Sequence, residues 1–178
     1  VEKGGEEWAG VPWQGEEAAR VGNRRPMMAE DTLAVVGTQS GEAADTIAGM
    51  RQALERGALT VAITNVVGST AARDAHGVIY LQAGPEIGVA STKTFVCHAI
   101  SHYLLAIRLA ASRHRLSPER LEDLVASLRA LPEGIRAVLK LEDRIKELAL
   151  KYSGYRNFMF TGRGVNYPIA LGGALKLK

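Results

Sequence analysis

The sequence predicts an α/β fold in which helices cover both faces of a parallel sheet, in three layers. Residues 32–36, 59–64 and 77–81 are short apolar runs rich in β-branched residues, which is typical of strands buried on both faces. Residues 41–56 carry apolar side chains at helical spacing, and residues 69–75 can form a short helix before the third run. This alternation of strand and helix with short connections is the pattern of βαβ units, and hence of a parallel sheet.

The chain on either side of this unit has a different character. The first thirty residues are rich in Gly, Glu and Arg and show no sustained period, so we expect an irregular arm. Residues 91–113 have the apolar face of a long helix. Ser117 and Pro118 supply an N-cap and a proline at the first helical position, which predicts another helix.

The C-terminal part predicts further helices and a return to α/β structure. Residues 133–151 indicate a third helix, residues 157–161 a strand, and residues 168–178 the start of a helix. We therefore expect an irregular N-terminal arm, an incomplete first α/β domain, a helical connector and the start of a second α/β domain: residues 1–30, 31–115, 116–155 and 156–178.

Composition and charge exclude several classes of protein. The 178 residues carry a net charge of +3, and the basic residues are spread along the chain, so we expect no nucleic-acid partner and favour a small anionic ligand. No apolar run approaches the ~20 residues of a membrane span, and the acidic start is unlike a signal peptide. We expect no membrane partner and a cytoplasmic protein. A single cysteine, Cys97, excludes an internal disulfide and a multi-cysteine zinc site.

The first candidate site is the loop of residues 38–42, Thr-Gln-Ser-Gly-Glu, between a strand and the helix that follows. Hydroxyls beside the free N–H groups of a helix N-terminus favour an anion. Thr38, Gln39 and Ser40 are therefore candidate ligand-binding residues. The alternative is structural, because Ser40 could serve only as the N-cap of the helix.

A second loop of the same kind, residues 84–93, follows the third strand and precedes the long helix. It contains Val89, Ser91 and Lys93, and the sequence slightly favours a solvated Lys93 over one that contacts a ligand. Two such loops at neighbouring strand ends would enclose one ligand at the carboxyl edge of the sheet.

Metal binding is not expected. His98 and His102 share a helix face at i and i+4, but Ala99 stands where a zinc protease needs Glu, and the neighbouring side chains are apolar. A structural role fits this pair better, so we expect no metal and no cofactor.

The motifs resemble a known family. Residues 38–46 are close to the Ser-Gln-Ser-Gly-Glu-Thr-Ala-Asp-Thr signature of the isomerase region of glutamine–fructose-6-phosphate transaminase, the glucosamine-6-phosphate synthase family. Residues 84–93 match that family's Gly-x-Glu-Ile-Gly-Val-Ala-Ser-Thr-Lys. Residues 65–69, 162–168 and 173–178 match further segments in the same order. The resemblance runs from about Asp31 to the end and implies sugar-isomerase (SIS) domains with a flavodoxin-like fold.

The resemblance implies a function and roles for particular residues. The family makes glucosamine 6-phosphate from fructose 6-phosphate and glutamine, as a homodimer. By resemblance, Thr38, Gln39 and Ser40 bind the phosphate, Val89 and Ser91 contact the sugar, and Lys176 belongs to the catalytic centre. The expected partner is fructose 6-phosphate or glucose 6-phosphate.

The departures from the family pattern also matter. Ala43 replaces the usual Thr, and Gly172 replaces a usual Glu. The arm lacks the family's Gly-Thr-Ser loop, the catalytic Glu would follow Lys178, and there is no glutaminase half with its N-terminal Cys. We therefore expect this chain alone to be inactive as an enzyme. Two alternatives stay open: a non-catalytic module that binds phosphosugars, and a deglycase of fructosamine phosphates that lacks a glutaminase domain.

Overall fold

The computed structural model describes residues 2–15, 18, 20–21 and 28–177. The chain forms two compact units, Val1–Arg113 and His114–Lys178. The first unit holds the sheet and both candidate loops, and the second consists of helices joined by extended segments.

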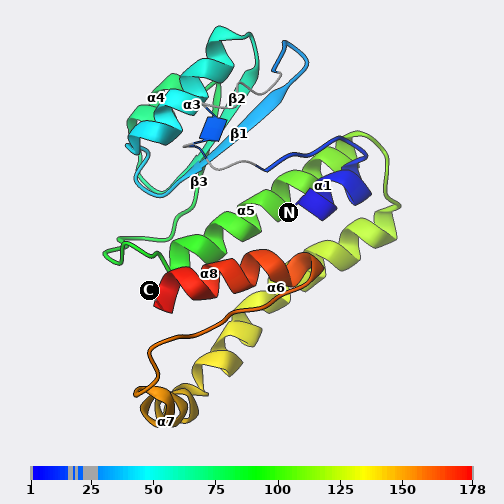
Figure 1. Ribbon diagram of the computed structural model, residues 1–178. Helices are drawn as coiled ribbons and strands as arrows, with labels where there is room; N and C mark the ends of the chain where they lie inside the picture. The colour runs from blue at the N-terminus through cyan, green and yellow to red at the C-terminus, as the bar shows by residue number, and fades with distance from the viewer. Residues whose placement is uncertain (1, 16–17, 19, 22–27, 178) are drawn as a thin grey trace. The chain divides into compact units, whose positions relative to one another are not determined.

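The sheet of the first unit is three-stranded and parallel, in the order β1 (Leu33–Thr38), β2 (Leu59–Thr64) and β3 (Gly77–Tyr80) (Figure 1). In the register, the last residue of β1 is paired with the last residue of β2, which is paired in turn with the last residue of β3. All three strands therefore end at one edge, from which the candidate loops leave. The predicted α/β fold with a parallel sheet is confirmed.

Burial differs between the strands. In β2, the side chains of Thr60, Ala62, Ile63 and Thr64 are buried, whereas β1 and β3 are largely half-exposed. The expectation of burial on both faces is thus right for β2 and wrong for the other two. The physical reason is position: β2 has a neighbouring strand on each side, whereas β1 and β3 lie at the edges of the described sheet.

Helices cover both faces of the sheet, as predicted. α3 (Ala44–Glu55) and α4 (Thr70–Asp74) lie on one face, and α5 (Lys93–Ser112) lies on the other (Figure 1). Met50 of α3, Ala62 of β2 and Ala71 of α4 form the fully buried core between the first two helices and the sheet. On the opposite face, Gly37 of β1 lies beside the rings of His98 and His102 in α5. That contact supports a structural role for the histidine pair.

The N-terminal arm is not irregular throughout, which corrects the expectation for residues 1–30. Helix α1 (Glu2–Ala9) packs on α5: the rings of Trp8 and Tyr103 lie 5.8 Å apart, and the Arg113 Nε donates to the carbonyl oxygen of Ala9 at 2.9 Å. A two-turn helix is too short to show a period in sequence and gains its stability from tertiary packing. Residues 16–17, 19 and 22–27 of the arm lie outside the described residues.

Helix α5 bears on the expectation of no membrane partner, which stays a prediction. Over the described residues, it is the one helix that is long and apolar enough to cross a membrane by length and composition, with a mean hydropathy of 1.3 in its most apolar window. No uninterrupted apolar run marks this helix in the sequence, because it also contains Ser, Thr and His. In the structure this helix packs on α1 and lies beside Gly37 of β1.

The second unit contains α6 (Pro118–Leu139), α7 (Glu142–Tyr152), a 3-10 turn (Gly164–Asn166) and α8 (Tyr167–Leu177). The predicted cap is confirmed, because the Ser117 Oγ accepts from the backbone N of Arg120 at 3.3 Å. The predicted start of α8 is also confirmed to within one residue.

Two predictions about this unit are wrong. The helix expected over residues 133–151 is divided differently, because α6 continues through Pro132 and the break falls at residues 140–141. Residues 157–161 form no strand, since the described part of this unit offers no second strand with which they could pair. The division of the chain into four segments stays a prediction.

Candidate functional site

The loop of residues 38–42, here called the first loop, is held by its own hydroxyl groups. Thr38 is buried, and its Oγ1 accepts from the backbone N of Gly41 at 3.2 Å. The Oγ of Ser40 accepts from the backbone N of Glu42 at 3.2 Å. The backbone carbonyl of Gln39 accepts from the N–H of Asn65, at 3.1 Å. The structure thus brings together the three candidate residues of this loop.

The N-terminus of α3, which follows the first loop, is left open. Its N-cap is Ala43, which has no side-chain acceptor, and within the described residues no side chain caps the helix. The alternative interpretation of Ser40 as the N-cap is therefore wrong, because the helix starts three residues further on. Residues 44–46 head the helix, and the first helical bond runs from the N–H of Ile47 to the carbonyl of Ala43. The hydroxyls of the first loop and the positive end of this helix lie next to each other.

The second loop, residues 84–92, supplies a side chain to the N-terminus of the helix that follows it, unlike the first loop. The carboxylate of Glu86 accepts from the backbone N of Thr92 at 3.1 Å and from the backbone N of Thr94 at 3.2 Å. These N–H groups, that of Thr94 foremost, lower the pKa of Glu86 below its usual value. The N-terminus of α5 is thus already occupied by an anion that belongs to the chain itself.

The candidate residues of the second loop, Val89, Ser91 and Lys93, differ in their contacts and exposure. The Oγ of Ser91 is hydrogen-bonded to the Oγ1 of Thr94, which also donates to Glu86 at 3.2 Å. The side chain of Val89 is fully exposed, and that of Lys93 is exposed. Ser91 has a φ of +57°, a left-handed conformation that the loop imposes on a non-glycine residue.

Asn65 links the two loops and was missed by sequence reasoning. Its Nδ2 donates to the carbonyl of Gly84 at 2.7 Å, and its Oδ1 accepts from the backbone N of Ala83 at 3.0 Å. Its own backbone N donates to Gln39 in the first loop. The available signal was its position directly after β2, at the same edge of the sheet as both loops.

The first loop also packs tightly on the residues that follow β2. Gly41 has a φ of +71°, and a Cβ placed on it would lie 2.0 Å from the Oγ of Ser69. Ser69 is buried, and its hydroxyl has no hydrogen-bond partner among the described residues. No side chain can therefore be accommodated at Gly41 without moving the loop.

The remaining candidates lie outside this cluster. Lys176 lies in α8, in the second unit, so its assignment to a catalytic centre stays a prediction. No group of three potential metal ligands occurs among the described residues. Burial, and to a lesser degree the neighbouring His102, lowers the pKa of His98 to about 4, so this imidazole is neutral at physiological pH.

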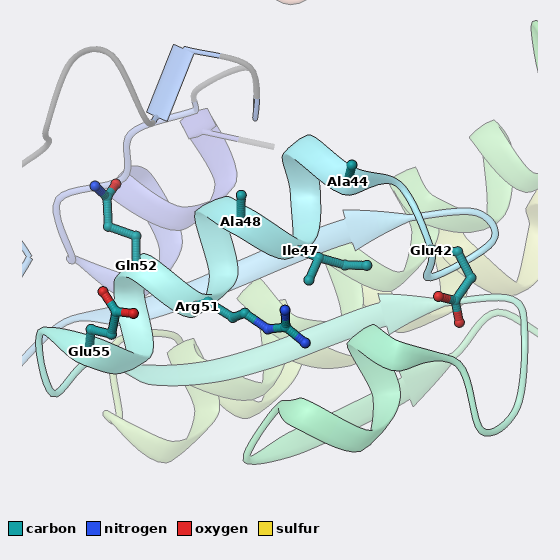
Figure 2. A pocket seen from close by; sticks show the side chains of 7 residues that line it. All are labelled: Glu42, Ala44, Ile47, Ala48, Arg51, Gln52 and Glu55. Atoms are coloured by element: carbon teal, nitrogen blue, oxygen red, sulfur yellow. The ribbon is translucent and has the colours of Figure 1, made fainter.

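A separate shallow depression of about 550 Å³ runs along α3 (Figure 2). Of the first loop, it includes only Glu42, at one end. The Arg51 guanidinium on its wall is already paired with Asp74, at 2.9 Å. The seven lining residues are Glu42, Ala44, Ile47, Ala48, Arg51, Gln52 and Glu55.

Fold and loops together define the class of protein. A parallel sheet with a hydroxyl-rich loop before an open helix N-terminus, at the carboxyl ends of the strands, is an arrangement of α/β domains that favours an anionic ligand. The family model for the SIS domain matches residues 6–108, and the chain belongs to this family.

Curated relatives agree with this assignment. The chain is 50% identical over 155 residues to the glutamine--fructose-6-phosphate aminotransferase (isomerizing) of Methanosarcina acetivorans, an alignment that covers 87% of this chain and 25% of the relative. It is 42% identical over 173 residues to the protein of the same name from Chlorobaculum tepidum, covering 97% of this chain and 28% of that one. The chain thus spans about a quarter of the length of these relatives.

A solved structure is also similar. The C-terminal domain of glucosamine-fructose-6-phosphate aminotransferase from Francisella tularensis superposes with a TM-score of 0.95 at 31% identity, over 99% of this chain and 50% of that chain. A glucosamine-6-phosphate deaminase from Thermotoga maritima superposes with a TM-score of 0.76 at 22% identity, over 98% of this chain and 51% of that one. At that identity, the second similarity concerns the fold alone. The predicted resemblance to the isomerase region of the transaminase is confirmed.

Proposed function

We propose that the first unit binds a sugar phosphate, with the phosphate group at the first loop. The observation that carries this proposal is the contrast between the two helix N-termini. That of α3 is open beside the hydroxyls of Thr38 and Ser40, whereas that of α5 is filled by Glu86. A dianionic phosphate is attracted by free N–H groups and by a helix dipole, and it is repelled by a carboxylate.

The sugar would then extend from the first loop toward the second. Val89 and Ser91 are the residues assigned to the sugar, and Asn65 ties their loop to the phosphate loop. In this proposal Thr38, Gln39 and Ser40 contact the phosphate. Neutral sugar hydroxyls suit this loop, whose carboxylate, Glu86, is already hydrogen-bonded.

For the whole protein, we infer the ketose–aldose isomerisation step of glucosamine 6-phosphate synthesis from fructose 6-phosphate. Support comes from the curated relatives that bear the aminotransferase name. Such an isomerisation moves a proton between neighbouring carbons and needs a positioned base. Lys176 would orient the substrate or polarise its carbonyl group. Cytoplasmic location and a homodimer of the complete protein belong to the same proposal.

A module that only binds phosphosugars is the second candidate. It is favoured by Gly172, which stands in α8 where the family pattern has a carboxylate. Turnover of fructose 6-phosphate by the complete protein separates this candidate from the first one.

Calorimetric titration of the chain with glucose 6-phosphate, fructose 6-phosphate and unphosphorylated fructose tests the binding proposal. We expect heat only from the phosphorylated sugars. Ser40→Ala should weaken binding by roughly 10- to 150-fold, because a hydrogen bond to a charged group contributes about 1.5–3 kcal/mol. Ser112→Ala, at an exposed position of the same unit, is the matched control and should leave the affinity unchanged. Equal heats for fructose and its phosphate would refute the proposal.

A further inference from the structure

We propose that Glu42 is a positioning residue of the first loop, which binds no ligand itself but fixes the loop to the start of α4. The inference rests on the proposed function, since it concerns the geometry of the same phosphate site. Nothing in the family pattern described above gives Glu42 a role.

The contacts of Glu42 are short and directional. The Oε1 of Glu42 accepts from the backbone N of Thr70 at 2.8 Å, and its Oε2 accepts from the Oγ1 of Thr70 at 2.8 Å. The Nη2 of Arg73 donates to the same Oγ1 at 3.0 Å. The Thr70 hydroxyl therefore accepts from Arg73 and donates to Glu42, which fixes the direction of its proton.

The backbone adds a third link in the same place. The N–H of Ala71 donates to the carbonyl of Gly41 at 3.0 Å. The first N–H groups of α4 thus find their acceptors in the first loop rather than in a side chain of their own segment, since Ser69, the N-cap of α4, makes no side-chain cap. Three hydrogen bonds therefore join the first loop to the start of α4.

A carboxylate next to a phosphate site needs an explanation, because like charges repel. Glu42 is ionised, since the backbone N–H of Thr70, and next its hydroxyl, hold the pKa of Glu42 below its usual value. Both of its oxygens accept from Thr70. The fixed geometry outweighs the repulsion, because an anion site requires donors placed to within about 0.5 Å.

The close packing of the loop shows why small displacements matter. Gly41 has no room for a Cβ against Ser69, and it lies between Ser40, a phosphate ligand in the proposal, and Glu42. Release of Glu42 from Thr70 frees the loop to move away from α4. The N–H groups at the head of α3 would then lose their alignment with the hydroxyls.

The direction in which one substitution changes the affinity for glucose 6-phosphate separates a positioning role of Glu42 from charge repulsion. Glu42→Gln removes the charge and places an amide N–H₂ against a hydroxyl that already accepts from Arg73. We expect glucose 6-phosphate to bind about 5- to 20-fold more weakly to this variant in calorimetric titration of the whole chain. If the carboxylate only repelled phosphate, the same variant would bind more tightly, and that result overturns the proposal.

A matched control removes one negative charge from the far end of α3, the helix that follows the first loop. Glu55 is exposed on the last turn of α3, so Glu55→Gln should bind glucose 6-phosphate within twofold of the unsubstituted chain. An equal loss in both variants would assign the effect to net charge and refute positioning. Failure of the unsubstituted chain to bind any sugar phosphate would instead refute the proposed function, so the two failures are distinguishable.

Thr70 provides a second test that does not depend on how Glu42→Gln folds. Thr70→Ser keeps the hydroxyl and should bind within twofold of the unsubstituted chain, whereas Thr70→Val should bind about 3- to 10-fold more weakly. The double variant Glu42→Gln/Thr70→Val should bind no more weakly than Glu42→Gln alone, because Thr70→Val removes one of the two hydrogen bonds that Glu42→Gln already disturbs. Additive losses, or equal binding by Thr70→Ser and Thr70→Val, would show that this contact does not position the loop.

Discussion

Substitution of Gly41 by Ala is the most direct test of how the first loop is packed. Gly41 is buried, with a φ of +71°. An added Cβ would lie 2.0 Å from the Oγ of Ser69, 2.4 Å from its Cβ and 3.0 Å from the Oγ1 of Thr64. Two costs therefore arise together: a backbone conformation that Ala rarely adopts, and a collision with a buried side chain.

The magnitude follows from these two costs. A left-handed conformation costs a non-glycine residue about 1–2 kcal/mol. Overpacking of a filled interior costs about 1–3 kcal/mol more, so Gly41→Ala should lower the free energy of unfolding by about 2–5 kcal/mol. Gly68 is the matched control, because its φ is +72° and nothing lies within 4 Å of its added Cβ. Gly68→Ala should cost only the conformational part, about 1–2 kcal/mol.

Urea unfolding followed by tryptophan fluorescence measures this difference. Both tryptophans of the chain, Trp8 and Trp13, belong to the unit that contains Gly41, so the signal reports on that unit. Addition of Ser69→Gly to Gly41→Ala should recover most of the collision cost, since it removes both of the closest atoms. Equal losses for Gly41→Ala and Gly68→Ala would refute the argument from packing.

Two further predictions concern α3 and α5. Ala43→Thr places a hydroxyl at the open N-cap of α3. It should tighten phosphate binding by about 0.5–1.5 kcal/mol and stabilise the fold by about 1 kcal/mol. Titration and urea unfolding measure the two effects, and the control Ala48→Thr should show neither. Since burial lowers the pKa of His98 from 6.5 to about 4, the native state favours the neutral imidazole. Stability should be full above pH 6.5 and decline as the pH falls toward 4, by about 1–2 kcal/mol after allowance for partial exposure. Urea unfolding at pH 7.5 and pH 4.5 measures this loss, and an undiminished loss in His98→Gln would contradict the assignment to His98.

The strands and most helices could be predicted because their signals are local. The strand from Leu59 to Thr64 was predicted with its observed bounds, since a short apolar, β-branched segment between turn residues is typical of a buried strand. The predictions failed where tertiary contacts determine whether a segment forms a helix. Helix α1 depends on the contact of Trp8 with Tyr103, and α6 passes through Pro132 although proline disfavours a helix interior.

In the candidate site, too, local patterns could be predicted and contacts between distant residues could not. Thr38, Ser40 and Ser91 could be proposed as candidates because hydroxyls in a loop before a helix form a short, recognisable pattern. Glu42 and Asn65 were not assigned a role, because their partners lie 28 and 19 residues away in sequence. No periodicity or capping pattern describes a side chain that satisfies the start of a different helix.

The contrast between the N-termini of α3 and α5 could not be predicted from the sequence. In sequence, the segments before α3 and α5 look alike, with small residues and hydroxyls in both. A capping box would place its acidic residue inside the first turn of the helix, but Glu86 lies in the loop, six residues before Thr92. Only the fold shows that this carboxylate fills the N-terminus of α5, while Ala43 leaves that of α3 open. If the proposed site is right, a ligand with a charged end and a neutral end has one favourable orientation in it, with the phosphate toward α3 and the hydroxyls toward Ser91.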